Sequence, residues 1–179
     1  FDEATNEIKQ GGKRRGANLG LLSVHHPDIV DFVKSKEDIT QFQNFNISVS
    51  ATNEFMSAVQ HGSSFQLKNP HTREKTNKDA GELFDLICHQ AWKNGEPGLV
   101  FIDTINAKNP TPWLGKMDVV NPCGEVPLLG WESCNLGSID VSKMAVDHRV
   151  NWDRLEEVVS IAVRFLDDVL SVNHYPSVK

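Results

Sequence analysis

The most informative stretch of this sequence is an irregular segment that begins at Asn121 and reads Asn-Pro-Cys-Gly-Glu-Val-Pro-Leu. In an extended backbone, side chains at alternate positions point to the same side, so Asn121, Cys123 and Glu125 would present an amide, a thiol and a carboxylate together. Pro122 lacks a backbone N–H and Gly124 lacks a side chain, which favours a rigid loop over a central strand. The segment therefore offers a sulfur centre, a neighbouring proton acceptor and an amide that can orient a substrate hydroxyl.

A second thiol, Cys134, follows eleven positions later within Glu-Ser-Cys-Asn-Leu-Gly-Ser. Two thiols brought together by a hairpin-like return could be redox partners, or one could be a radical centre and the other a reductant. A lone cysteine is more often a small buried residue than a catalyst, and Cys88, in the middle of a predicted helix, is expected to be one. For Cys123 the residue type and its loop position leave both interpretations open.

The composition excludes several classes of protein. The chain has 179 residues, with 18 Lys and Arg against 24 Asp and Glu, and the net charge of −6 argues against a nucleic-acid partner. No apolar run approaches the roughly 20 residues of a membrane helix. The Cys123–Cys134 spacing is too wide for half of a zinc ribbon, and the histidines are scattered, so no metal site is predicted. A cytoplasmic location is expected, and the start without Met or leader suggests a piece of a longer protein.

Strand and helix patterns alternate along the chain and predict the α/β class with a parallel sheet. In the first half of the chain the predicted elements are a helix that ends near residue 10 at Gly11-Gly12, an extended segment at 14–24, a helix that begins at 25–28, a strand at 45–50 and a short helix capped by Thr52. They are followed by a strand at 65–67, a helix that begins at Asp79, a buried strand at 99–102 and a long helix at 151–172.

Two features of this pattern argue against a complete domain. Three or four strands are too few for a stable independent parallel sheet. The helix that follows Asn151 carries a wide apolar stripe that requires a partner the chain does not supply. The helix from Asp79 is expected to bury an apolar side made of Leu83, Phe84, Leu86, Ile87, Ala91 and Trp92. The polar stretch 68–78 is expected to be a surface excursion.

Asn-Pro-Cys-Gly-Glu at 121–125, followed by Glu-Ser-Cys-Asn-Leu-Gly-Ser at 132–138, closely resembles the active-site segment of ribonucleotide reductase large subunits. Its Pro and Gly resemble the adenosylcobalamin-dependent class II branch, whereas iron-dependent class I enzymes usually differ at those two positions. Further similarity lies in the segments 10–17, 26–29, 44–49 and 96–101. The resemblance implies that residues 1–179 are the central portion of a catalytic barrel domain, part of a ten-stranded α/β barrel that is incomplete at both ends.

The resemblance also implies a role for each residue of the first motif. Cys123 resembles the thiyl radical that abstracts the hydrogen at C3′ of a ribonucleotide. Glu125 resembles the base that takes the 3′-hydroxyl proton and helps the 2′-hydroxyl leave as water. Asn121 resembles the residue that holds the ribose hydroxyls, and the backbone of Pro122 and Gly124 would line the same pocket.

Other implied partners lie around this motif. Cys134 resembles one of two cysteines that reduce the substrate radical and end as a disulfide, with its partner upstream of residue 1 and a thioredoxin-like or other thiol as external reductant. The loop 34–43 falls at the family's specificity loop, where Gln41 and Gln43 could read a nucleotide effector; a solvated loop is the alternative. Adenosylcobalamin would generate the radical, in an enzyme expected to be a homodimer.

The sequence therefore predicts thiyl-radical reduction of ribonucleotides to 2′-deoxyribonucleotides. The form of the motif favours ribonucleoside diphosphates over triphosphates as substrates. One alternative is a class I large subunit that uses a separate metal-radical subunit. Another is a nucleotide-binding module that kept the fold and lost the chemistry, against which the joint presence of Asn121, Cys123, Glu125 and Cys134 argues. The isolated chain is expected to be inactive, because the partner cysteine and the family's phosphate-binding helix start are missing.

Overall fold

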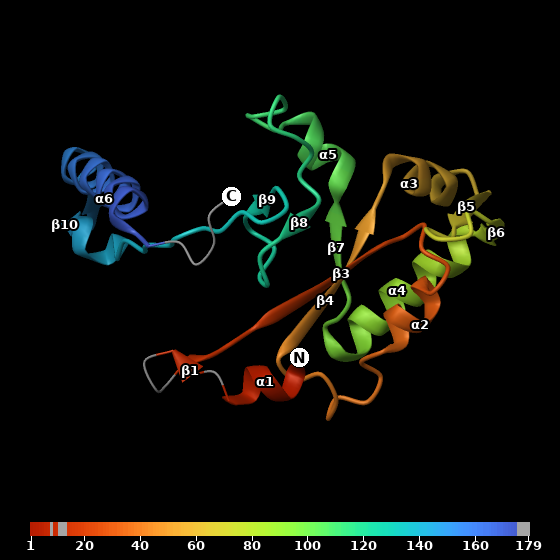
Figure 1. Cartoon of the computed structure of the whole chain (residues 1–179). Coiled ribbons are helices and arrows are strands. Elements are labelled where there is room, and N and C mark those ends of the chain that lie inside the picture. Colours follow the sequence, from red (N-terminus) through yellow and green to blue (C-terminus); the bar gives the residue numbers. More distant parts are fainter. Residues whose placement is uncertain (8, 11–13, 175–179) are drawn as a thin grey trace. The chain divides into compact units, whose positions relative to one another are not determined.

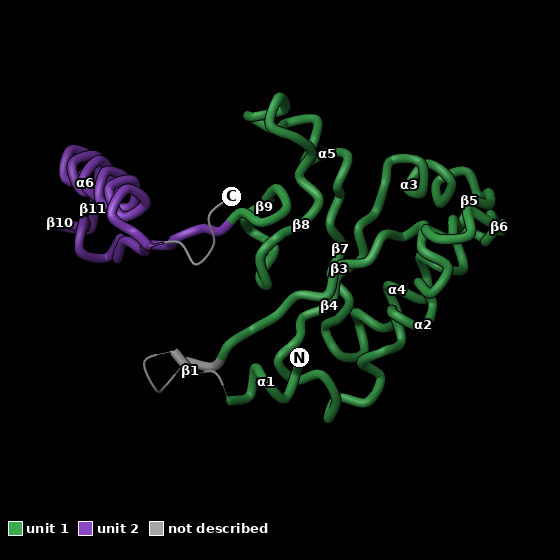
Figure 2. Tube along the Cα trace, viewed as in Figure 1, with its two compact units in different colours: residues 1–132 green, residues 133–179 purple. Residues whose placement is uncertain are grey.

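The computed structural model describes residues 1–7, 9–10 and 14–174 (Figure 1). The chain divides into two compact units, residues 1–132 and residues 133–179 (Figure 2). Each unit has its own elements and is described by itself.

A three-stranded parallel sheet in the order β3-β4-β7 forms the centre of the first unit (Figure 1). The strands are β3 (Asn18–Ser23), β4 (Phe45–Ala51) and β7 (Gly98–Phe101). The α/β class with a parallel sheet is thus confirmed. The strand predicted at 45–50 is also confirmed, and within it Ile47 and Val49 are buried whereas the polar residues between and beside them are not.

The strands β4 and β7 approach each other closely at Gly98, which is opposite Ser48 in the register. A Cβ atom added to Gly98 would lie 2.8 Å from the Ser48 hydroxyl oxygen, closer than van der Waals contact allows. A glycine at this position therefore lets the third strand pair with the second.

Three helices of the first unit pack against one another: α2 (Ile29–Lys34), α3 (Asn53–Gln60) and α4 (Ala80–Asn94). The predicted caps of the last two are confirmed, since Thr52 accepts a hydrogen bond from the Phe55 N–H and Asp79 accepts one from the Glu82 N–H. The apolar core joins these helices to the sheet and to β5, and its buried members are Val24, Ile29, Val33, Val49, Ala51, Phe55, Ala58, Phe65, Leu67, Ala80, Leu83 and Ile87.

Short elements complete both units. The first unit also holds α1 (Asp2–Glu7), β1 (Lys9–Gln10) paired with β2 (Arg14–Arg15), β5 (Ser64–Lys68) paired with β6 (Lys75–Asp79), α5 (Ile102–Ala107), and β8 (Val119–Val120) paired with β9 (Pro127–Leu128). The second unit holds the 3₁₀ helix η1 (Val141–Met144), β10 (Ala145–Val146) paired with β11 (Arg149–Val150), and α6 (Trp152–Val172). None of the helices in the described ranges has the length and apolar character needed to cross a membrane.

Two predictions of where elements begin or end in the N-terminal half of the chain are wrong. The first helix ends at Glu7 and is followed by β1, and the expected Gly11-Gly12 cap lies outside the described residues. The stretch 68–78 is largely exposed as expected, but its residues from Lys75 onward form the polar strand β6, which is held by antiparallel backbone pairing with β5, whose Phe65 and Leu67 lie in the core.

The predicted buried face of α4 is confirmed at Leu83 and Ile87 and is wrong at Trp92. Its buried positions are Ala80, Leu83, Ile87 and Gln90, whereas Trp92 is 82% exposed. A residue five positions after Ile87 lies about 140° around a helix from it, away from the core. The expected strand 99–102 is shifted by one residue, because the following residue already begins α5, and it is buried only at its third position.

The long C-terminal helix begins and ends where the sequence predicts. Asn151 caps α6 by accepting a hydrogen bond from the Arg154 N–H, and the helix ends at Val172. Its apolar side chains are not buried within the described chain, and Ile161 and Phe165 are 61% and 65% exposed.

Candidate active site

The residues that carry the candidate chemistry form a tight turn, and the extended backbone assumed for them in the sequence is wrong. The Gly124 N–H donates a hydrogen bond of 2.8 Å to the Asn121 carbonyl. Asn at the first position, Pro at the second and Gly at the fourth are typical of a type I turn, and Cys123, at the third, does not have the positive φ that a type II turn requires. Gly124 itself has a φ of 81°, which turns the chain back. The prediction of a loop is confirmed.

The turn closes a short hairpin between β8 and β9. The Asn121 N–H donates to the Val126 carbonyl at 3.3 Å, and the Val126 N–H donates to the Asn121 Oδ1 at 3.0 Å. The neighbouring Val120 is buried and anchors the hairpin. The Asn121 Oδ1 atom accepts a hydrogen bond within the hairpin, so the Nδ2 group is the part of this side chain that can donate to a bound molecule.

One side chain of the central sheet holds this turn. Asn46, the second residue of β4, donates from Nδ2 to the Pro122 carbonyl at 2.8 Å. Sequence reasoning missed this role, although β4 offered a signal: its positions that alternate with the buried Ile47 and Val49 are polar. Strands of a parallel sheet are usually apolar on both faces, so a polar face on one of them indicates a functional surface.

A second asparagine fixes the chain that leads into β8. The Asn106 Oδ1 accepts from the Met117 N–H at 2.9 Å, and its Nδ2 donates to the carbonyls of Met117 and Ile102 at 2.8 and 2.9 Å. Asn106 lies on α5, whose Asp103 accepts a hydrogen bond of 2.7 Å from the Asn53 N–H at the start of α3. The candidate hairpin is therefore held by Asn46 of β4 at its turn and by Asn106 of α5 at Met117, just before β8.

The structure brings residues 121–125 together in one turn and leaves the thiol accessible. Cys123 and Glu125 are exposed, whereas Asn121 and Pro122 are half-buried. A thiol enclosed in the apolar interior would have contradicted the sequence interpretation, and Cys123 is not enclosed. Cys88 is also exposed, so the expectation that it is a buried residue is wrong; it lies about 100° around α4 from the buried Ile87.

Cys134 belongs to the second unit, where it is exposed and free. It lies in a segment without regular structure that precedes η1. The next residue holds this segment to α6, because the Asn135 side chain donates to the Leu166 carbonyl at 2.9 Å. The redox role of Cys134 stays a prediction.

The whole chain, residues 1–179, matches the family described as the ribonucleotide reductase barrel domain. The chain belongs to this family. A vitamin B12-dependent ribonucleoside-diphosphate reductase of Mycobacterium tuberculosis (strain CDC 1551 / Oshkosh) is 52% identical over 178 residues, which are 98% of this chain and 26% of the relative. A relative of the same name in Thermoplasma acidophilum is 49% identical over 98% of this chain and 23% of its own length.

A ribonucleoside-diphosphate reductase subunit alpha of Chlamydia muridarum is more distant, at 26% identity over 99% of this chain and 21% of the relative. The chain thus spans about a quarter of the length of these two vitamin B12-dependent relatives. The family resemblance and the barrel fold class inferred from the sequence motifs are confirmed.

The loop 34–43, for which the sequence predicts a role in specificity, is held at its tip by hydrogen bonds. Asp38 accepts hydrogen bonds from the Thr40 hydroxyl, the Thr40 N–H and the Gln41 side chain, at 2.6, 2.9 and 3.1 Å. These bonds, the one from the Thr40 hydroxyl first, hold the pKa of Asp38 below its ordinary value. Gln41 and Gln43 are both exposed, and their role as readers of an effector stays a prediction.

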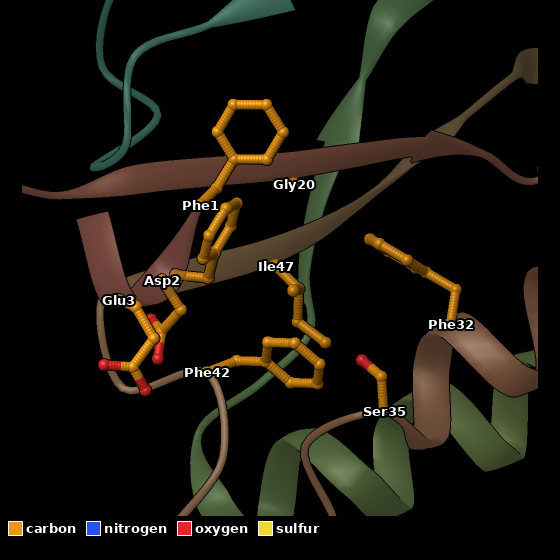
Figure 3. A pocket seen from close by; sticks show the side chains of 9 residues that line it. Phe1, Asp2, Glu3, Gly20, Phe32, Ser35, Phe42 and Ile47 are labelled. Atoms are coloured by element: carbon orange, nitrogen blue, oxygen red, sulfur yellow. The ribbon is translucent and has the colours of Figure 1, made fainter. Parts of the chain in front are cut away.

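An apolar hollow of about 460 Å³ adjoins this loop (Figure 3). Phe42 of the loop, Phe32 of α2 and Ile47 of β4 contribute side chains to it. Phe42 is 44% exposed and has a φ of 53°, in the left-handed region that bulky residues rarely adopt. The side chain of Phe42, near the end of the loop, thus lines the same apolar hollow as Ile47 of the sheet.

Proposed function

We propose that this chain is the central portion of the catalytic barrel of an adenosylcobalamin-dependent ribonucleotide reductase, which converts ribonucleoside diphosphates to 2′-deoxyribonucleoside diphosphates. The observation that carries the proposal is the accessible thiol of Cys123, at the tip of a hydrogen-bonded turn between an amide and a carboxylate. The match to the reductase family over the full chain supports it.

In this proposal Cys123 is the catalytic thiyl radical. A new S–H bond forms on Cys123 while the C3′–H bond of the ribose breaks, so the unpaired electron moves to the sugar. Glu125 then takes the 3′-hydroxyl proton, while a thiol of the reducing cysteine pair gives a proton to the 2′-hydroxyl, so that the C2′–O bond breaks and water leaves. General base catalysis of this kind contributes about 10²- to 10⁴-fold when the base is within hydrogen-bond reach.

The turn supplies the positioning. The hydrogen bond from Val126 to the Asn121 Oδ1 fixes the orientation of the amide, so that Nδ2 is the group offered to the ribose hydroxyls. Gly124 has no side chain, which allows the sugar to approach the backbone beside Cys123. Reacting atoms must meet at about 3–3.5 Å, so a rigid turn is a better support than a mobile loop.

The residues present fit the cofactor in one respect, an accessible thiol that is free of structural bonding. When bound, adenosylcobalamin would supply the oxidising radical that converts a thiol to a thiyl. The names of the relatives at 52% and 49% identity, which include vitamin B12, support this choice over a class I enzyme. We propose that the groups that hold the corrin belong to other parts of a longer polypeptide.

Other partners in this proposal follow from the same assignment. Cys134 and a second cysteine outside this chain give two electrons to the substrate and become a disulfide, which a thioredoxin-like thiol reduces. A nucleotide effector contacts the loop 34–43 through Gln41 and Gln43, and the intact enzyme is a homodimer. The free cysteines of the described chain are consistent with a cytoplasmic enzyme.

A cysteine-to-serine exchange in the intact reductase tests the proposal. Cys123→Ser is expected to bind a ribonucleoside diphosphate as the wild type does and to show no turnover with adenosylcobalamin and a dithiol. Cys88→Ser is the matched control, because Cys88 is also exposed and lies on α4, and it is expected to retain turnover. Normal turnover by Cys123→Ser would contradict the radical site.

Two further results separate the alternatives. Turnover that needs a second, metal-containing subunit rather than adenosylcobalamin would identify a class I enzyme. Nucleotide binding without any turnover by the wild type would identify a module that lacks the chemistry.

A further inference from the structure

The hairpin of β5 and β6 concentrates positive charge in a chain that is acidic as a whole (Figure 1). Residues 68–78 include four Lys and Arg residues and one Glu, whereas the whole chain has a net charge of −6. Three of these cations, Lys68, Arg73 and Lys75, line one hollow of about 310 Å³ together with Asn69 and Pro70. A concave site of this size can hold a small ligand.

The strand register places two of these cations directly opposite each other. Lys68 is paired with Lys75 in the antiparallel ladder. Like charges at such positions destabilise a hairpin, because the Cβ atoms are only about 5 Å apart. Neither these lysines nor Arg73 form an ion pair within the described part of the chain, whereas Lys78 on the same hairpin is paired with Glu82 at 3.3 Å. An anion in the hollow would offset this repulsion.

The turn between the two strands is held by Asn69, which leaves one donor of this residue for a ligand. The Asn69 Oδ1 accepts hydrogen bonds from the N–H groups of His71 and Thr72 at 2.9 and 3.1 Å, and the Asn69 carbonyl accepts one from the Arg73 N–H at 3.0 Å. The Asn69 Nδ2 makes no hydrogen bond to the residues that the structure describes. A side-chain amide can therefore donate to a molecule in the hollow that Asn69 lines.

Arg73 occupies a backbone conformation that favours glycine. Its φ is 65°, in the left-handed region, where a side chain costs stability. The next residue, Glu74, is not its ion-pair partner, and its Oε2 accepts a hydrogen bond of 3.0 Å from the Thr72 hydroxyl. Strained conformations cluster at ligand sites, and a guanidinium that lines the hollow gives this one a use.

We infer that the hollow of Lys68, Asn69, Pro70, Arg73 and Lys75 binds a polyphosphate group, either free or at the end of a nucleotide. A guanidinium binds phosphate oxygens in a two-pronged geometry, and lysines bind them as point charges. None of the residues that line the hollow is aromatic, so the site recognises the phosphates through charge and hydrogen bonds rather than by stacking on a base. This site lies beyond the proposed function and does not depend on it.

Hydrogen exchange of the intact protein in inorganic triphosphate tests the site where it lies. We expect slower exchange at the amides of Asn69 and Arg73, whose hydrogen bonds close the turn, and the dependence on concentration gives a Kd for the hollow alone. Lys75→Gln should raise this Kd by about 2- to 5-fold, as expected for one exposed and partly screened charge. Without triphosphate the same variant should protect the hairpin better, because the repulsion from Lys68 is gone.

The matched control is Lys78→Gln, which removes the same charge from the same hairpin outside the hollow and is expected to leave the Kd unchanged. An equal rise in Kd for Lys78→Gln and Lys75→Gln would overturn the site, because it would show a response to net charge alone. If Lys75→Gln unfolds the hairpin, Arg73→Gly decides. It should raise the Kd without lowering the protection of the ligand-free turn, because glycine adopts its conformation without strain.

Two further probes separate the sources of the anion. The same Kd at the turn for ATP and for inorganic triphosphate would support a site for the phosphates alone, and a lower Kd for ATP would support the tail of a nucleotide. An unprotected turn at millimolar triphosphate would overturn the inference. Protection by a polyglutamate peptide in place of triphosphate would also overturn it and would identify a surface for an acidic protein.

Discussion

The hydrogen bond from Asn46 to Pro122 gives the sharpest prediction of how the sheet serves the chemistry. Asn46→Ala removes the Nδ2 donor and leaves the Pro122 carbonyl without this partner. Asn46 is exposed and Pro122 is half-buried, so water can replace the lost donor. The free energy of unfolding should therefore fall by only about 0.5–1 kcal/mol, at the lower end for a hydrogen bond.

The effect on turnover should be much larger than the effect on stability. The turn would keep its internal bonds between Asn121, Gly124 and Val126, but it would lose its link to β4. A displacement of a reacting group by about 1 Å can cost 10²-fold in rate, so we expect kcat to fall by about 10- to 100-fold with little change in KM.

Urea unfolding and steady-state kinetics of the intact reductase measure these two quantities. Asn77→Ala is the matched control, because Asn77 is an exposed asparagine on the strand β6 of the separate hairpin. It should leave kcat unchanged. A kcat of Asn46→Ala within twofold of wild type would refute the argument that β4 positions the thiol.

Three other variants test single features of the chain. Cys134→Ser should bind substrate but give no repeated turnover with a dithiol, because one electron donor of the pair is lost; sustained turnover would contradict its redox role. Gly98→Ala should lower the free energy of unfolding in urea by about 1–3 kcal/mol, because its Cβ would lie 2.8 Å from the Ser48 hydroxyl oxygen; adding Ser48→Ala should restore part of this loss. In an NMR titration Asp38 should have a pKa below its ordinary value, so its stabilising contribution is present at neutral pH and lost as the pH falls through that lowered value. Thr40→Val should raise this pKa, since it removes the hydroxyl donor; an unchanged midpoint would show that the side-chain bond is absent in solution.

Elements that depend on local chemistry were predictable from the sequence. The caps at Thr52, Asp79 and Asn151 were correct, because a polar side chain before an apolar periodic stretch satisfies the first helical N–H groups through short-range contacts. The strand at 45–50 was correct because successive side chains of a strand point to opposite faces, so Ile47 and Val49 alternate with polar residues. The sequence predicts a loop at Cys123, which is correct. Its Asn-Pro-x-Gly pattern is typical of a tight turn, whereas a shared direction for the side chains of residues 121, 123 and 125 requires extended backbone.

Features that depend on distant contacts were not predictable. Asn46 and Pro122 are 76 positions apart, and no local pattern indicates that they meet. The exposure of Cys88 and Trp92 was missed because helical spacing defines faces relative to one another, whereas packing decides which face meets the core. The motif in the sequence identifies the candidate residues. The side chains that hold their turn in place, such as Asn46 and Asn106, are identified only by the structure.

The architecture of the turn that carries Cys123 has a practical consequence. Its internal hydrogen bonds run between main-chain groups and one asparagine amide, so the sulfur at position 123 has no part in holding the hairpin together. A spin label or fluorophore attached there would report the motion of the hairpin itself, provided that the other exposed thiols, at positions 88 and 134, are first exchanged for serine.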